Sequence, residues 1–232
     1  AEMCKEGDYF TPGAVLSEME YEAAAGLVQE MDPDEAAAVL GIEMDATCAA
    51  EILTVMDYDD GAAAVLTEIE DPDVAGKILG HMDSSVAAGI VAEMEFEDSA
   101  PMVAEMEYDM AFNLLAEMDA GTASGVVSLM EAETAGHIMM AAESYYVASE
   151  IFSHLTEECA AEEYEVSANA LRLMDAENAA RILEHVEDYE DAAYILGEME
   201  YPDAANVVGS MGVHANLAIL SYLEYGDQSG IL

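Results

Sequence analysis

Apolar and acidic residues follow one another in a short phrase that returns every 12 or 13 residues along the chain. An apolar residue, most often methionine, is followed at once by aspartate or glutamate, and more apolar residues stand about five, eight, nine and twelve positions later. In the copy that begins at Met31 these positions hold Ala36, Val39, Leu40 and then Ile42 or Met44. This spacing places the apolar side chains on one face of a helix, so each copy predicts one short helix of about 8 to 9 residues.

The phrase is regular over most of the chain. Its first ten copies begin at Met19, Met31, Met44, Met56, Ile69, Met82, Met94, Met106, Met118 and Met130. It returns at Met174, Val186, Met199, Met211 and Leu223. The stretch between, at about 142–173, is expected to be an irregular unit, either an insertion or a bent pair of helices. Irregular units are places where a repeat array bends or meets a partner.

The acid after each leading residue marks the start of a helix. Asp32 suits the N-cap, Pro33 suits the first helical position, and Glu35 can complete a capping box. Where a copy has 13 residues, we expect the extra residue to lie in the turn, as Asp71 followed by Pro72 indicates.

Helices this short are not stable alone in water, so each must bury its apolar face against its neighbours. The sequence therefore predicts an all-α fold, a right- or left-handed α-solenoid or superhelix of about 16–18 short helices. We expect residues 1–10 to form an N-terminal arm, 11–225 a single elongated helical-repeat domain, and 226–232 a C-terminal tail. Close helix packing is expected at glycines inside the copies, such as Gly26, Gly61, Gly89 and Gly125.

The charge balance narrows the classes of partner. The chain has 51 acids, four Lys or Arg residues and a net charge of −47, yet 53% of its residues are hydrophobic, which favours a folded protein over a disordered one. This charge disfavours binding to nucleic acid or to anionic lipid. A basic protein surface or divalent cations would relieve the repulsion, and an acidic surface that only maintains solubility is the alternative. No apolar run reaches the ~18 to 20 residues of a transmembrane helix, so we expect none.

Candidate contact residues come from two places. An acid stands directly before the leading residue, in the last turn of a helix, where a carboxylate opposes the helix dipole at a cost of about 0.3–1 kcal/mol. These acids are Glu18, Glu30, Glu43, Glu68, Glu93, Glu105, Glu117 and Glu198. Either they cap the start of a helix, or they form an acidic ridge that meets a positive partner. For the second case we select Glu93, Glu105 and Glu117, and we add Tyr145, Tyr146 and Tyr164 of the irregular unit as candidate partner contacts.

The sequence offers little chemistry of other kinds. It has no nucleophile with a base in a recognised order and no glycine-rich phosphate loop, so we expect neither an enzyme nor a cofactor. Cys4, Cys48 and Cys159 are far apart; one disulfide is compatible with them, and a zinc site is not supported. Acid groups such as Asp32, Asp34 and Glu35, or Asp57, Asp59 and Asp60, could hold Mg²⁺ or Ca²⁺ weakly through water, but no EF-hand spacing is present.

Two adjacent segments carry a family resemblance. They read MDPDEAAAVLGIEMDATCAAEIL (31–53) and MDYDDGAAAVLTEIEDPDVAGKIL (56–79). Together they resemble the intracellular N-terminal domain of the MgtE family of magnesium transporters, and the same repeat style extends over most of residues 11–225. The resemblance implies an acidic superhelix of short helices that takes part in magnesium sensing. It does not imply transport, because the regulatory and membrane domains of that family have no counterpart in this sequence.

We therefore expect a non-enzymatic acidic scaffold or linker subunit that mediates contacts between protein subunits with basic surfaces in a larger assembly. A link between an algal photosystem and its light-harvesting antenna is one such setting, which would place a soluble or peripheral protein at the chloroplast thylakoid. The start at Ala1-Glu2 fits removal of a targeting segment and fits a truncated chain equally well. The alternative function is a Mg²⁺- or Ca²⁺-binding or sensing module.

Overall fold

The computed structural model describes residues 11–56, 58–142, 144–157, 164–186 and 188–223. Within those ranges the chain forms seventeen α-helices, two short π-helical segments and no strand. It divides into two compact units, Ala1–Met106 and Glu107–Leu232. The predicted arm and tail lie outside the described residues, and the single domain over 11–225 stays a prediction.

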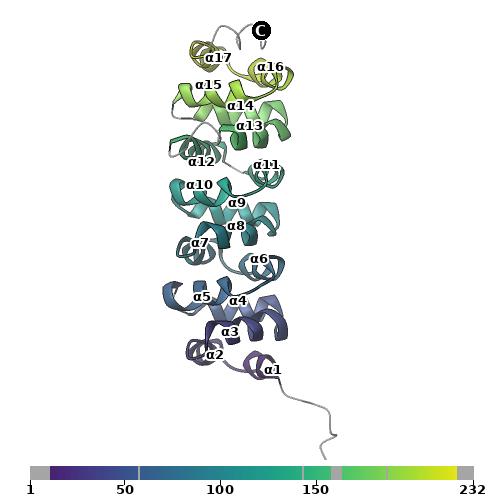
Figure 1. The fold of residues 1–232 in the computed structure, drawn as a ribbon, viewed down its shortest axis with the longest axis vertical. Helices are drawn as coiled ribbons and strands as arrows, with labels where there is room; N and C mark the ends of the chain where they lie inside the picture. The colour runs from purple at the N-terminus through teal and green to yellow at the C-terminus, as the bar shows by residue number, and fades with distance from the viewer. Residues whose placement is uncertain (1–10, 57, 143, 158–163, 187, 224–232) are drawn as a thin grey trace, which may run out of the picture. The chain divides into compact units, whose positions relative to one another are not determined.

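Both units are built from short helices joined by short turns (Figure 1). The first unit contains α1 (Pro12–Ser17), α2 (Tyr21–Val28), α3 (Pro33–Ala38), η1 (Val39–Glu43), α4 (Ala46–Thr54), η2 (Tyr58–Ala63), α5 (Ala64–Thr67), α6 (Pro72–Gly80), α7 (Ser84–Ala92) and α8 (Phe96–Ala104). The second contains α9 (Tyr108–Glu117), α10 (Ala120–Ser128), α11 (Ala132–Met140), α12 (Tyr145–Glu157), α13 (Tyr164–Leu173), α14 (Ala176–His185), α15 (Tyr189–Glu198), α16 (Tyr201–Ser210) and α17 (Val213–Leu220).

Each helix packs chiefly against the helix two places along the chain. In the first unit α2 contacts α4, α4 contacts α6, and α6 contacts α8; in the second the same relation runs from α9 to α11 and on to α13, α15 and α17. The irregular unit keeps this order, because α12 packs on both α10 and α14 although it is 13 residues long. The predicted all-α helical-repeat fold is confirmed.

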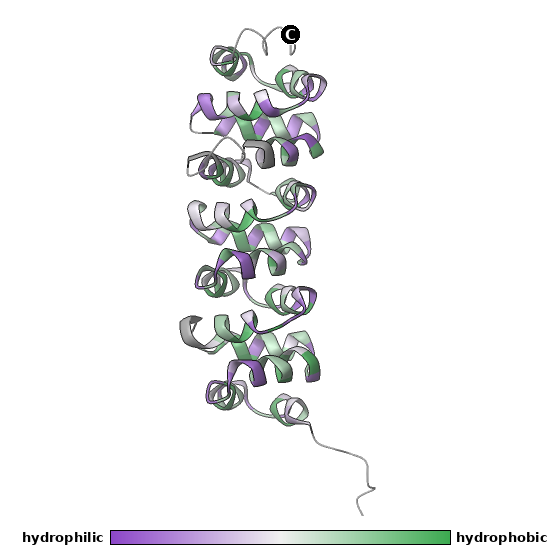
Figure 2. Ribbon diagram, in the orientation of Figure 1, coloured by the Kyte–Doolittle hydropathy of each residue, from purple (hydrophilic) through white to green (hydrophobic). Residues whose placement is uncertain are grey.

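The buried face of most helices repeats one composition. Two small residues and two larger apolar residues are buried, as in α4 with Ala49, Ala50, Ile52 and Leu53. These residues stand five, six, eight and nine positions after the leading residue. The sequence predicts burial at positions five, eight and nine, and position six widens the buried face by one residue. The leading residue is also buried or half-buried in each copy, as Met56 and Met106 illustrate. Figure 2 shows the result, with hydrophobic and hydrophilic residues on each helix.

Aspartate and glutamate behave differently at the helix starts. The side chain of Asp45 accepts hydrogen bonds from the backbone N–H groups of Thr47 and Cys48, and Asp119 caps α10 in the same way through Thr122. Glu95 and Glu131 occupy the same N-cap position without a side-chain cap bond. The shorter aspartate side chain suits the cap geometry. Among the aspartates, Asp32 has the expected extended backbone but its carboxylate makes no cap bond.

Copies of 13 residues accommodate the extra residue in two ways. In the copies that begin at Ile69 and Val186 it lies in the turn, and Asp71 and Asp188 cap the next helix, as predicted. The prediction is wrong for the copy that begins at Met31, where the helix continues past α3 into the π-helical turn η1. It is also wrong for the copy at Met56, which contains η2. One residue inserted within a helix widens a turn in this way.

Glycines allow close helix contacts at fewer places than the sequence suggests. A Cβ atom on Gly76 of α6 would lie 2.5 Å from the carbonyl oxygen of Met102 in α8, and one on Gly136 would lie 2.9 Å from the carbonyl oxygen of Ala170. The prediction of close packing is wrong for Gly26, which has nothing within 4 Å of the added Cβ. At Gly61 the added Cβ would lie 3.3 Å from Cε of the flexible Met56 side chain and 3.8 Å from Nε2 of Gln29, and it would meet no backbone atom of another helix among these nearest neighbours.

Candidate functional site

The selected acids are on the surface, at the ends of their helices. Glu93 and Glu105 follow α7 and α8 in the first unit, and Glu117 ends α9 in the second; all three are exposed. Their side chains make no hydrogen bond to another residue in the described ranges. Glu105 nevertheless lies near a base, Lys77. The pKa of Lys77 is raised, first by its hydrogen bond with Asp73, and the negative charge of Glu105 adds to this rise. Their role as partner contacts stays a prediction.

Another last-turn acid supports the capping alternative. Glu43 is the last residue of η1, and its Oε2 atom accepts a hydrogen bond of 2.9 Å from the backbone N–H of Gly13, at the start of α1. Glu184, in the last turn of α14, likewise accepts a hydrogen bond from the N–H of Gly212, directly before α17. Some of these acids therefore compensate the open end of a different helix.

Two last-turn histidines bond back to their own helix. Nδ1 of His154 lies 3.0 Å from the carbonyl oxygen of Glu150, and Nδ1 of His185 lies 2.7 Å from that of Arg181. Because a carbonyl only accepts, Nδ1 carries the proton in both rings. Each ring therefore donates to a carbonyl group one turn earlier on its own helix, and neither bond reaches another helix.

Of the three candidate tyrosines, Tyr145 has its polar and aromatic groups engaged inside the second unit. Its hydroxyl donates a 2.8 Å hydrogen bond to Oδ1 of Asn178 in α14, and the guanidinium of Arg181 lies 5.2 Å from its ring centroid. These contacts tie α12 to α14. Tyr146 is 58% exposed, and the side chain of Tyr164 lies outside the described part of the chain.

A larger feature, which the sequence analysis did not identify, is a hollow of about 600 Å³ in the first unit. It lies where the end of α3 and η1 face the connection from α5 to α6. Its apolar lining consists of Ala37, Ala38, Gly41, Ile42, Ile69 and Val74, and its acidic lining consists of Asp34, Glu68, Glu70 and Asp71. We call it the η1 groove.

Electrostatic repulsion is concentrated at one side of the η1 groove. The pKa of Glu68 is raised, first by a hydrogen bond with Asp34 and then by the negative charge of Asp34, with further repulsion from Asp32 and Asp98. Two carboxylates that share a proton or repel each other mark a place where a positive charge is favourable.

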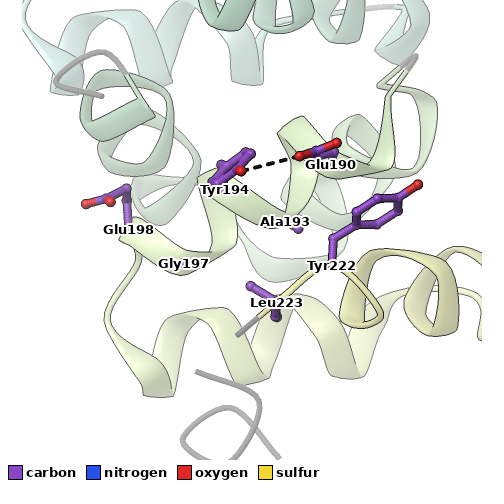
Figure 3. Close-up of a pocket in the computed structure, with 7 residues that line it drawn as sticks. All are labelled: Glu190, Ala193, Tyr194, Gly197, Glu198, Tyr222 and Leu223. Atoms are coloured by element: carbon purple, nitrogen blue, oxygen red, sulfur yellow. Dashed lines mark hydrogen bonds between the residues drawn. The ribbon is translucent and has the colours of Figure 1, made fainter. Parts of the chain in front are cut away.

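A smaller hollow of about 170 Å³ lies at the last described helices (Figure 3). It is bounded by α15 and by Tyr222 and Leu223, which follow α17. The hydroxyl of Tyr194 donates a hydrogen bond of 3.3 Å to Glu190 along one side of it. Among the described residues that line it, the charged groups are the carboxylates of Glu190 and Glu198.

Neither a metal centre nor a membrane span is evident in the described ranges. No three or more His, Cys, Asp or Glu side chains gather there in a way that could hold a metal ion. The acid group at Asp57, Asp59 and Asp60 lies outside the described side chains. Cys48 is a free thiol, while Cys4 and Cys159 lie outside the description. Every described helix is too short or too polar to cross a bilayer.

Comparison with known proteins gives one match. Residues 58–145 match the family model described as the MgtE intracellular N domain. The resemblance expected from the repeats is thereby confirmed for this part of the chain, which spans the end of the first unit and the start of the second. No curated protein and no solved structure matches the chain.

Proposed function

We propose that the chain is a non-enzymatic, acidic helical-repeat protein that binds basic surfaces of partner proteins in a larger assembly. The observation that supports this proposal is the excess of exposed acids over bases. The chain has 51 acids and four Lys or Arg residues, so few acids can be neutralised within the fold. Within the described residues the ion pairs are Lys77 with Asp73 and Arg181 with Glu177, and each is an exposed pair within one helix.

This excess has a physical consequence. Uncompensated charge of one sign weakens a compact fold and attracts surfaces of the opposite sign. The last-turn acids add to this cost, because they oppose the helix dipole wherever they do not cap another helix. A basic partner would reduce both the repulsion between the acids and the unfavourable interaction of the last-turn acids with the helix dipole. The narrower setting, between an algal photosystem and its antenna, stays a prediction to which no observation on the described residues adds support.

The test is a charge reversal at the three selected acids. The chain is isolated with its partners from the cells that make it, at low salt, and is compared with the variant Glu93→Lys, Glu105→Lys, Glu117→Lys. We expect a stoichiometric, positively charged partner that is released as salt rises and that the variant retains less well. The melting temperature of the variant should not fall, because the exchange removes carboxylates that oppose the helix dipole.

The control carries the same change of charge elsewhere. Glu18→Lys, Glu30→Lys, Glu198→Lys alters three exposed acids at the same position of the repeat. Equal loss of the partner from both variants would show that charge matters but that the selected acids do not. A chain that is recovered alone at low salt would contradict the proposed function, and early melting of the first variant would assign its acids to capping.

A divalent-cation module is the alternative, and the match of residues 58–145 to the MgtE intracellular N domain favours it. Calorimetric titration with Mg²⁺ at constant ionic strength distinguishes the two functions. A saturable isotherm of fixed stoichiometry supports cation binding, whereas a shallow response that Na⁺ reproduces supports the scaffold.

A further inference from the structure

The η1 groove combines an apolar lining with an acidic edge, and the π-helical turn accounts for the most exposed apolar group in it. The turn lies directly after α3 and carries Gly41 and Ile42. Ile42 is 83% exposed, whereas Val39 and Leu40, in the same turn, are buried. An aliphatic side chain held in solvent on a regular element, beside a hollow, marks a surface that gains from being covered.

The charges around the groove indicate that a ligand bound there carries positive charge. Asp34, Glu70 and Asp71 surround the apolar lining together with Glu68, whose pKa is raised by its closeness to Asp34. A Lys or Arg side chain placed there would replace repulsion between carboxylates with attraction. A metal ion fits less well, because half of the lining is aliphatic and offers no oxygen ligand. A second copy of this chain, with a net charge of −47, would add repulsion.

We propose that the η1 groove binds a segment of a partner protein in which an aliphatic or aromatic side chain is flanked by Lys or Arg residues. The apolar side chain packs on Ile42, Ile69 and Val74, and the basic groups meet Asp34 and Glu68. This inference rests on the proposed function, because it specifies the chemistry of the basic partner proposed there. It places the contact on the η1 groove and not on the selected last-turn acids.

The experiment uses the full chain and a random library of 12-residue peptides displayed on phage. The wild-type chain is the target, and the double variant Ile42→Ser, Glu68→Gln serves for counter-selection, which removes peptides that bind the acidic surface in general. We expect enriched peptides to combine Lys or Arg with Leu, Ile or Phe. Methyl resonances of Ile42, Ile69 and Val74 should shift when such a peptide is added.

Single variants with matched controls locate the contact. Ile42→Ser and Glu68→Gln should each weaken binding of an enriched peptide by about tenfold, a change that one central contact commonly produces. Val55→Ser and Glu30→Gln change an exposed aliphatic residue and an exposed last-turn acid outside the groove, and they should leave binding within about twofold. All four side chains are exposed, so circular dichroism should show no variant that melts earlier than the wild-type chain.

The outcomes separate this inference from the proposed function. Polybasic peptides that bind the wild-type chain and the double variant equally would overturn the groove as a site and leave the proposed function in place. Enriched peptides without positive charge would contradict both. A dimer in light scattering that Ile42→Ser dissociates would show that a second copy occupies the groove, which also overturns the inference.

Discussion

Replacing Gly76 with alanine adds one methyl group on the side of α6 that packs against α8. The new Cβ would lie 2.5 Å from the carbonyl oxygen of Met102 and 3.4 Å from Cβ of Glu105. A carbon atom and a carbonyl oxygen normally stay about 3.3 Å or more apart. The two helices must therefore separate locally by roughly 0.8 Å, and a gap of this size forfeits a quarter to a half of the dispersion energy of the atoms concerned.

Two opposing terms set the size of the effect. Overpacking in a well-packed core costs about 1–3 kcal/mol. Alanine in place of glycine within a helix recovers about 0.5–1 kcal/mol, because it restricts the unfolded chain. We expect Gly76→Ala to lower the free energy of unfolding by about 1–2 kcal/mol, which corresponds to a fall in melting temperature of about 2–4 °C for each kcal/mol in a chain of this length.

The chain offers a control with the same chemistry and the opposite sign. Gly26→Ala in α2 places its methyl group with nothing within 4 Å, so only the gain of about 0.5–1 kcal/mol remains and the melting temperature should rise. Gly136→Ala, at 2.9 Å from a carbonyl oxygen, should be destabilising but less so than Gly76→Ala. Thermal unfolding followed by circular dichroism measures all three. Equal stabilisation at Gly26 and Gly76 would refute the close approach of α6 and α8.

Three further predictions concern charge and capping. Asp119→Ala should lower the free energy of unfolding by about 1 kcal/mol at neutral pH. The pKa of Asp119 is lowered, first by its hydrogen bond with the Thr122 side chain and then by the Thr122 backbone N–H. The stability from this cap is therefore present above the ordinary aspartate pKa and is lost as pH falls through the lowered value, so the melting curves of the variant and the wild type should converge in acid. Glu43→Ala should lower the melting temperature by removing the cap on Gly13, whereas Glu30→Ala should not, and an equal effect of both would reject the cap. The melting temperature of the wild-type chain should rise between low and moderate salt, because screening over a ~10 Å Debye length weakens self-repulsion; a constant value would exclude charge repulsion as a limit on stability.

The sequence predicts the helices well because their signal is local and is repeated many times. The spacing from each leading residue fixes one face of a helix, and the same face is buried in α4, α7 and α14. The packing partner is not encoded in that spacing. Contact with the helix two places along follows from how successive turns orient the chain, and those orientations depend on backbone angles that the pattern of apolar residues does not specify.

Glycine shows where sequence reasoning reaches its limit. Gly26 and Gly76 look alike in the sequence, since each stands seven residues after the leading residue of its copy. They differ in the face of the helix on which they lie. Gly76 is buried on α6 and directed at α8, while Gly26 is exposed on α2. Counting from the leading residue does not separate them, because both stand at position seven. Counting from the N-cap does, because Gly76 stands five residues after Asp71, on the buried face, and Gly26 stands six residues after Glu20.

The placement of the extra residue in the 13-residue copies connects the sequence to the η1 groove. The position of the capping aspartate decides the outcome: Asp71 stands two places after Ile69, so the turn takes up the extra residue, whereas Asp32 stands directly after Met31 and is followed by Pro33. Proline at the first helical position fixes the helix start. The extra residue of that copy must then lie inside the helix, where it widens the last turn into η1 and leaves Ile42 exposed beside Ile69 and Val74. A 13-residue copy with an early Asp-Pro pair thus predicts a π-helical turn, and with it the exposed aliphatic side chain on which the proposed peptide contact depends.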